Sequence, residues 1–171
     1  MHFEGKQTLE LSQAKAWQFL TDPNQVGQCV PGLQSIAVVD ATHFNAEVGF
    51  GVGSFTATFT INVEWLELEA PHRARMKMHG SASNSVVDGE SEIKLSTVDQ
   101  NTTNLEWTAE VNIGGTLASV ANRLMGGITQ KLTGKFFDCM KEKMEEKERP
   151  QKSAAKKKPR RFRLTRKKQS S

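Results

Sequence analysis

The sequence predicts an α+β fold in which an antiparallel sheet of about seven strands packs against one long C-terminal helix. Three patterns indicate this fold: alternating apolar and polar residues in the middle of the chain, two short helical stretches before them, and a helical apolar stripe after residue 116. All the helices then gather on one face of the sheet. A twisted sheet wrapped around the long helix would leave a space between them.

The strands are indicated by alternation with a period of two residues. In residues 55–65 every odd position is apolar and nearly every even one is polar, and the same pattern returns in residues 105–113. Residues 73–78 place basic residues on one face and methionines on the other. Weaker strands are expected over residues 3–11, 33–39, 44–52 and 86–98, with turn-forming residues between them.

The helices are indicated by capping residues and by apolar spacing. Ser12 is a good N-cap for a helix over residues 13–21, and Pro23 can open a second short turn. The long helix is expected over residues 116–148. After Leu124 its apolar stripe steps by four residues, which turns the stripe about 40° at each step against 3.6 residues per turn. We therefore expect a bend, at Gly126 and Gly127 or at Gly134.

Charge divides the 171-residue chain into a body and a tail. Ten residues from 150 to 171 are basic and none is acidic, which leaves 13 basic and 19 acidic residues in the body. The body is therefore acidic, which argues against a nucleic-acid-binding domain with basic residues spread over its fold. We predict one ligand-binding domain over residues 1–149 and a disordered basic tail over residues 150–171.

Cysteine usage and the N-terminal segment suggest where the protein resides. Cys29 and Cys139 lie 110 residues apart, and a body of this size does not need a disulfide to form a core. Free thiols in a reducing compartment are therefore expected. Glu4 and Lys6 interrupt any apolar N-terminal stretch, and no run of about 20 apolar residues occurs. A cytoplasmic protein is expected.

The sequence shows no arrangement typical of catalysis or metal binding. It contains neither a GxSxG elbow nor an HExxH motif, so no catalytic residue and no metal ligand is predicted. The glycines at 49, 51 and 53 lack phosphate-loop spacing and precede a strand, so they favour a bend or bulge. The four histidines stand singly near expected strand ends or turns, as solvated surface residues do: His2, His43, His72 and His79.

Large apolar side chains gather on the face of the sheet that is expected to face the long helix. On the strands these are Phe50, Phe55, Phe59, Trp65, Met76, Met78 and Trp107. On the helix they are Leu117, Leu124, Met125, Ile128 and Phe136. Aromatic rings and pliable methionines suit an adaptable apolar pocket, and they equally suit a dry core. From these residues alone a dry core is the simpler interpretation.

Several motifs together resemble one protein family. They are Trp17-x-x-Leu20-x-Asp22-Pro23, Cys29-Val-Pro31-Gly32, Gly51-x-Gly53-x-Phe55-x-x-x-Phe59, Gly114-Gly115-x-Leu117-Ala118-x-Val120-x-x-Arg123-Leu124 and Phe136-Phe137. With them the chain, from Met1 to about Met144, resembles the CoxG family (the G subunit of carbon monoxide dehydrogenase) of the START-like SRPBCC superfamily. The resemblance implies a helix-grip fold, in which a curved antiparallel sheet grips the C-terminal helix over an apolar cavity.

The resemblance also implies a function. The cavity of the protein would hold a small apolar ligand, for which a respiratory quinone such as menaquinone is the candidate, and no covalent cofactor would be needed. The partners implied are a molybdenum hydroxylase of the carbon monoxide dehydrogenase type and an anionic membrane at the cytoplasmic side. The ligand-binding residues would then be Phe50, Phe55, Phe59, Trp65, Met76, Met78, Trp107, Leu117, Leu124, Met125 and Ile128. This interpretation favours a pocket over a dry core.

The tail would serve as the membrane or partner anchor. The anchor residues would be nine of its ten basic residues and two apolar ones that could enter the interface: Lys156, Lys157, Lys158, Arg160, Arg161, Phe162, Arg163, Leu164, Arg166, Lys167 and Lys168. Gly126 and Gly127 are either a hinge through which ligand enters or a means of close packing against a strand. Two other functions stay open: an SRPBCC enzyme of the cyclase or aromatase kind acting on a hydrophobic substrate, or an adaptor that binds polyanions through its tail.

Overall fold

The structure is a computed structural model that describes residues 1–148. The strands are β1 (His2–Leu9), β2 (Leu33–Val38), β3 (His43–Val52), β4 (Phe55–Glu69), β5 (Arg73–Ala82), β6 (Ser85–Asp99) and β7 (Thr102–Gly115). The helices are α1 (Gln13–Thr21), α2 (Pro23–Val26), the 3₁₀ turn η1 (Gly27–Cys29) and α3 (Thr116–Glu148). The α+β prediction is confirmed. The basic tail predicted at residues 150–171, with its anchor residues 156–168, lies outside the described residues.

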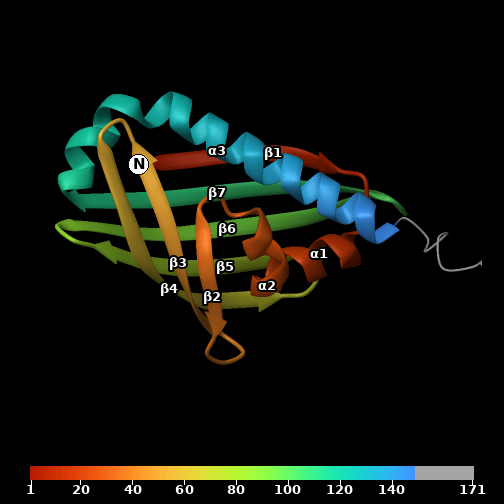
Figure 1. Cartoon of the computed structure of the whole chain (residues 1–171). Helices are drawn as coiled ribbons and strands as arrows, with labels where there is room; N and C mark the ends of the chain where they lie inside the picture. Colours follow the sequence, from red (N-terminus) through yellow and green to blue (C-terminus); the bar gives the residue numbers. More distant parts are fainter. Residues whose placement is uncertain (149–171) are drawn as a thin grey trace, which may run out of the picture.

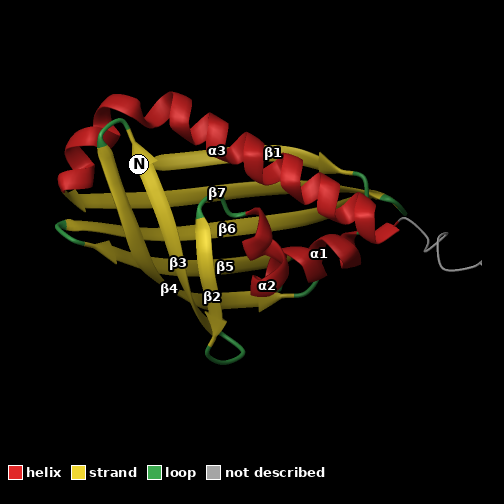
Figure 2. Cartoon of the chain, in the orientation of Figure 1, coloured by secondary structure: helices red, strands yellow, loops and turns green. Residues whose placement is uncertain are grey.

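The seven strands form one antiparallel sheet in the order β1-β7-β6-β5-β4-β3-β2. Figure 1 shows β2 and β3 running steeply across the direction of β6 and β7, so the sheet is strongly twisted and curved. The α-helices of the described chain all lie on the same face, as Figure 2 shows. The sheet therefore has an inner face toward the helices and an outer face away from them, with β1 and β2 as its two edges.

The glycine-rich segment of β3 ends in a tight hairpin turn. Val52 pairs with Phe55, so Gly53 and Ser54 form the turn, and Gly53 has a φ of +60°. The register of β3 on β4 is continuous up to that turn, so the predicted bend is a turn and not a bulge. Gly32 has a φ of +81° and lies against Gly49, where a Cβ would fall 2.1 Å from the Gly49 carbonyl oxygen. Only glycine fits there.

Capping side chains set the beginnings of the two short helices. The Ser12 hydroxyl accepts a hydrogen bond from the Lys15 backbone N–H at 3.4 Å, and the Asp22 carboxylate accepts one from the Asn24 N–H at 2.9 Å. Pro23 occupies the first turn of α2, where it needs no N–H partner. These contacts place α1 and α2 as predicted.

Figure 1 shows that the predicted bend in α3 is present, since its first turns stand at an angle to its long remainder.

The tightest core lies at the C-terminal end of α3. Met140 is fully buried and Met144 nearly so, and both pack in one cluster with Phe19 and Leu20 of α1. Leu105 of β7 closes the cluster from the sheet. This core fixes the last turns of α3 against α1 and the sheet, while the first half of the helix takes no part in it.

The two cysteines form a disulfide, so the prediction of free thiols is wrong. Cys29 of η1 and Cys139 of α3 are bonded, with their Cα atoms 5.4 Å apart. The prediction failed because separation along the sequence does not show which residues meet in the fold. Packing of α3 on η1 brings the two cysteines together. One reason for expecting a reducing compartment is thereby lost. The bond fastens α3 to η1 beside the tight core.

We predict that replacing both cysteines by serine lowers the free energy of unfolding by about 2–5 kcal/mol, because the disulfide closes a long loop in the unfolded chain. Urea unfolding followed by circular dichroism measures this loss. A strong reductant should lower the urea midpoint of the unaltered protein to that of the variant. The same reductant should leave the midpoint of the variant unchanged. Identical midpoints for oxidised and reduced protein would contradict the prediction.

Candidate ligand-binding cavity

Two adjoining cavities lie between the inner face of the sheet and α3. The first has a volume of about 310 Å³ and lies under the first half of α3. Its lining comprises Val48, Phe50, Val52, Phe59, Ile61, Met78, Gly80, Val87, Ile113, Leu117, Val120, Ala121, Ile128, Thr129 and Leu132. It is therefore closed by β3 to β7 on one side and by α3 on the other.

The second cavity has a volume of about 420 Å³ and extends toward α2 and η1. Large aromatic side chains of the sheet and of α3 line it, including Phe44, Trp65, Trp107 and Phe136. Four residues line both cavities: Val48, Ile61, Met78 and Leu132. The two spaces are therefore separated only by side chains, of which the methionine is the most pliable.

The structure brings most of the predicted ligand-binding residues to these cavities. Phe50, Phe59, Met78, Leu117 and Ile128 line the first, and Trp65, Met76, Met78 and Trp107 line the second. Phe55, the first residue of β4, lines neither cavity, although its partner Val52 lines the first. Leu124 and Met125 belong to α3, but their side chains are outside those described.

Sequence reasoning missed several lining residues. Ile61 follows Phe59 by two residues in the same alternating pattern, so the sequence could have identified it as a lining residue. Val48 lies on the inner face of β3, where the alternation is weaker. Leu132 belongs to the apolar stripe of α3, but the stripe alone cannot separate a cavity wall from a packed core.

The cavity linings are almost wholly apolar. Among the described residues their only side-chain polar groups are the hydroxyls of Ser91, Thr129 and Thr133 and the indole N–H groups of Trp65 and Trp107. No acidic, basic or histidine side chain lines either cavity in the described part of the chain. Such a site can bury a hydrophobic molecule and offer it a few hydrogen bonds, and it supplies no group for proton transfer near neutral pH.

The indole ring of Trp107 occupies space that only a glycine on the neighbouring strand leaves free. Gly5 of β1 pairs directly with Trp107, and a Cβ on Gly5 would lie 2.7 Å from three atoms of the indole ring. The ring therefore rests on the bare backbone of β1. Its Nε1 is buried and has no hydrogen-bond partner among the described residues. A buried donor left unpaired costs about 1–3 kcal/mol, so the position is an unusual one for a structural tryptophan.

The glycines of α3 are not needed for close packing. A Cβ on Gly126, Gly127 or Gly134 would meet no atom of another element within 4 Å. The packing explanation for Gly126 and Gly127 is therefore wrong, because open space surrounds both positions. The hinge stays a prediction.

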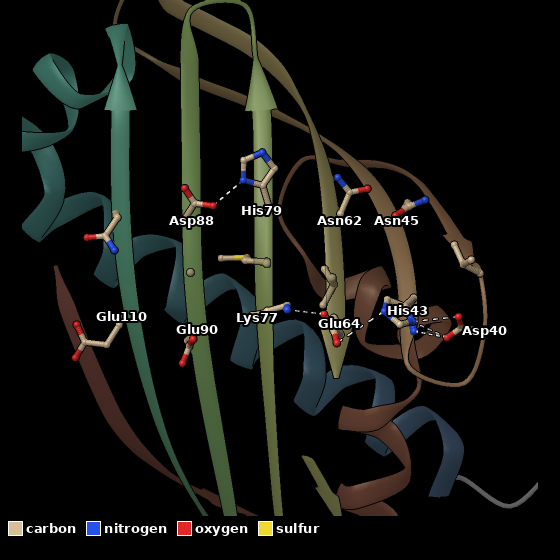
Figure 3. A pocket seen from close by; sticks show the side chains of 15 residues that line it. Asp40, His43, Asn45, Asn62, Glu64, Lys77, His79, Asp88, Glu90 and Glu110 are labelled. Atoms are coloured by element: carbon tan, nitrogen blue, oxygen red, sulfur yellow. Dashed lines mark hydrogen bonds and ion pairs between the residues drawn. The ribbon is translucent and has the colours of Figure 1, made fainter. Parts of the chain in front are cut away.

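The outer face of the sheet carries a different, polar hollow of about 840 Å³. Figure 3 shows its side chains on β3 to β7, with α3 behind the sheet. Lys77 donates to Glu64 at 2.7 Å, which lowers the pKa of Glu64, and His79 pairs with Asp88 at 2.6 Å. Hydrogen bonds from the Thr42 backbone N–H and the His43 ring lower the pKa of Asp40 to about 2. These exposed pairs fit a solvated surface, as predicted for the histidines.

Within residues 1–148, no group of three or more His, Cys, Asp or Glu side chains is placed to hold a metal ion. The same residues contain no helix with both the length and the apolar composition needed to cross a bilayer.

The sequence pattern of a known family covers most of the described chain. The family described as CoxG, the G subunit of carbon monoxide dehydrogenase, matches residues 5–145. The chain belongs to the CoxG family. The resemblance seen in the motifs is thus confirmed, and the matched region of this CoxG-family chain includes every described residue that lines the two cavities. No curated protein matches the chain.

Solved structures share the fold at low sequence identity. A conserved protein from Geobacillus kaustophilus is 20% identical, with a TM-score of 0.79 over 85% of this chain and 96% of that one. A START superfamily protein from Mycobacterium smegmatis is 10% identical, with a TM-score of 0.56 over 85% and 95%. The ZhuI aromatase/cyclase from Streptomyces sp. R1128 is 14% identical, with a TM-score of 0.54 over 81% and 92%. They confirm that this CoxG-family chain has the helix-grip fold.

We predict that Gly5→Ala destabilises the protein by about 1–3 kcal/mol, because the added methyl group overlaps the indole of Trp107 and must push it from its place. Gly127→Ala is the matched control: it adds the same methyl group in open space and should stabilise α3 by up to about 1 kcal/mol. Thermal unfolding of both variants shows whether each substitution lowers or raises the stability. Equal effects would show that the Gly5–Trp107 contact is not tight.

Proposed function

We propose that this CoxG-family protein is a non-catalytic binding protein for an apolar ligand, a respiratory quinone such as menaquinone. It assists membrane recruitment of a molybdenum hydroxylase of the carbon monoxide dehydrogenase type, and electron transfer from it. The observation that carries the proposal is the pair of adjoining apolar cavities of about 310 and 420 Å³ beneath α3. Each falls within the size range of small-molecule sites, and together they form an elongated space.

The cavity linings support retention of an isoprenoid chain. Each Å² of apolar surface removed from water contributes roughly 25 cal/mol, so a chain of several isoprene units buried here is held firmly. Met76 and Met78 can adapt to chains of different length. A quinone also carries carbonyl oxygens, for which the hydroxyls of Ser91 and Thr133 and the indole N–H groups are suitable donors.

Binding is favoured over catalysis by the chemistry of the described lining. Cyclisation of a hydrophobic substrate needs groups that move protons, and hydroxyls and indoles titrate far from neutral pH. The aromatase/cyclase shares the fold at 14% identity, a level at which its chemistry does not transfer. The enzyme alternative therefore has only the fold in its favour.

The hydroxylase and the membrane enter the proposal through the family and the tail. The family is named for carbon monoxide dehydrogenase, and a quinone bound by this protein would carry electrons from such an enzyme to a membrane. The ten basic residues after residue 149 suit an anionic bilayer, at roughly 1 kcal/mol for each charge near the surface. A carrier of a lipid-soluble ligand needs such contact to exchange it.

We predict that Val48→Trp weakens binding of decylubiquinone at least tenfold, because Val48 lines both cavities and an indole there fills the space between them. Equilibrium dialysis of purified protein measures the affinity. Val98→Trp is the control, since Val98 is 56% exposed and lines neither cavity. Loss of binding in both variants, or in neither, would argue against a ligand in the cavities. Protein from its native host should also yield a quinone on solvent extraction.

We predict that the full chain co-sediments with vesicles containing anionic lipid, and that a chain ending at residue 149 does not. The effect should weaken with added salt, because exposed charges are screened over about 8 Å at physiological ionic strength. Vesicles of neutral lipid provide the control for charge. If the truncated chain binds as well as the full one, or if neutral vesicles serve equally, the tail is not a membrane anchor.

A further inference from the structure

A groove runs along the edge of the sheet between β1 and α3. Its volume is about 760 Å³, and one wall is β1 from Met1 to Gln7. The other wall is the face of α3 that carries Gly126, Thr129, Gln130, Thr133 and Gly134. Figure 1 shows α3 passing over the sheet beside β1, which is the edge strand.

The groove adjoins both cavities and shares wall residues with each. Thr129 lines the groove and the first cavity, whereas Trp107 and Thr133 line the groove and the second. The buried Nε1 of Trp107, which has no partner among the described residues, lies here beside Gly5.

The character of the surface changes from apolar to polar where the groove adjoins the cavities. On the cavity side the lining is almost entirely hydrocarbon, whereas the groove contributes the amides of Gln7 and Gln130 and the hydroxyls of Thr129 and Thr133. The charged groups of the β1 wall are engaged: Lys6 pairs with Glu106 at 2.7 Å, His2 contacts Glu110 and lies 3.4 Å from Glu4, and the Met1 ammonium donates to the Val111 carbonyl at 2.6 Å. The groove thus offers uncharged hydrogen-bonding groups beside apolar side chains.

The hollow that adjoins the opposite end of the second cavity is smaller than the β1–α3 groove. This hollow of about 270 Å³ shares Phe44 and Trp65 with the second cavity, but it shares no residue with the first. Its helical wall is α1, which the tight core fixes through Phe19 and Leu20. The wall of α3 along the β1 groove precedes both the disulfide and that core, so it is the less restrained of the two.

We propose that the β1–α3 groove seats the polar head of an amphipathic ligand whose apolar chain lies in the two cavities. The head is uncharged and accepts hydrogen bonds, which Trp107, Thr133 and Gln130 are placed to donate. This inference rests on the proposed function and deepens it: the ligand class is an amphiphile with a compact acceptor-bearing head and a long hydrocarbon chain, not a pure hydrocarbon.

Gly126→Leu and Gly134→Leu test the groove, because both glycines line it and a Cβ at either meets no other element within 4 Å. Each leucine narrows the groove without touching the cavity linings. Two probes with the same ten-carbon chain separate head from chain: decylubiquinone, which has a polar quinone head, and decylbenzene, which has none. We expect each variant to bind decylubiquinone at least tenfold more weakly and decylbenzene within twofold of the unaltered protein, by equilibrium dialysis.

Two variants serve as matched controls. Gly127→Leu makes the same change on the same helix at a residue that lines neither the groove nor a cavity, and Ala41→Leu narrows the opposite hollow. Neither should change the affinity for decylubiquinone. In the reverse direction, Phe3→Ala widens the groove and should not weaken binding of the quinone.

The outcomes separate this inference from the function on which it rests. If the unaltered protein binds both probes and the groove variants bind decylubiquinone normally, the groove is not the head-group seat, while the binding function stands. Equal losses for both probes, or a loss in Ala41→Leu alone, would likewise overturn the inference. If the unaltered protein binds neither probe, the proposed function itself fails.

Discussion

The attachment of α3 at both of its ends across a curved sheet is the constraint on which the rest of the structure depends. Met140 and Met144 bury themselves against α1 and the sheet, and the bond between Cys29 and Cys139 fastens the same end to η1. At the other end α3 follows β7 directly, and the Leu117 N–H donates to the buried Ser85 hydroxyl at 3.1 Å. Between these two attachments the helix crosses a curved sheet, and the cavities lie between helix and sheet.

The two faces of the sheet perform different physical tasks. On the inner face, burial of apolar side chains supplies the stabilising free energy and shapes the cavities. On the outer face, cross-strand ion pairs such as Lys77 with Glu64 and Arg73 with Glu92 favour the observed register of the strands and give the sheet a hydrated surface. Exposed pairs of this kind contribute about 1 kcal/mol or less each. The stability of the sheet therefore rests on its inner face, which is also where the ligand would bind.

The sequence predicted what local physics determines, and it failed where contacts are distant. Alternation, the Ser12 cap and the glycine and proline positions suffice for the strands and for α1 and α3, because each is set by neighbours in the chain. The disulfide was missed because its formation needs η1 and α3 to meet across 110 residues. Phe55 has the parity of Phe59 but lines neither cavity. Parity gives the face of a residue and not how far along the strand the helix covers it.

The cavities themselves are an argument for function. Protein interiors normally pack to a density that leaves few voids larger than a water molecule, and each void costs free energy through contacts that its lining side chains lose. Spaces of about 310 and 420 Å³ far exceed that norm. Larger side chains at Val48 or Ala121 would fill them, and the glycines at 126 and 127 weaken the helix where alanine would fit. Small lining residues that leave an apolar space open at a cost in stability are expected where binding requires that space.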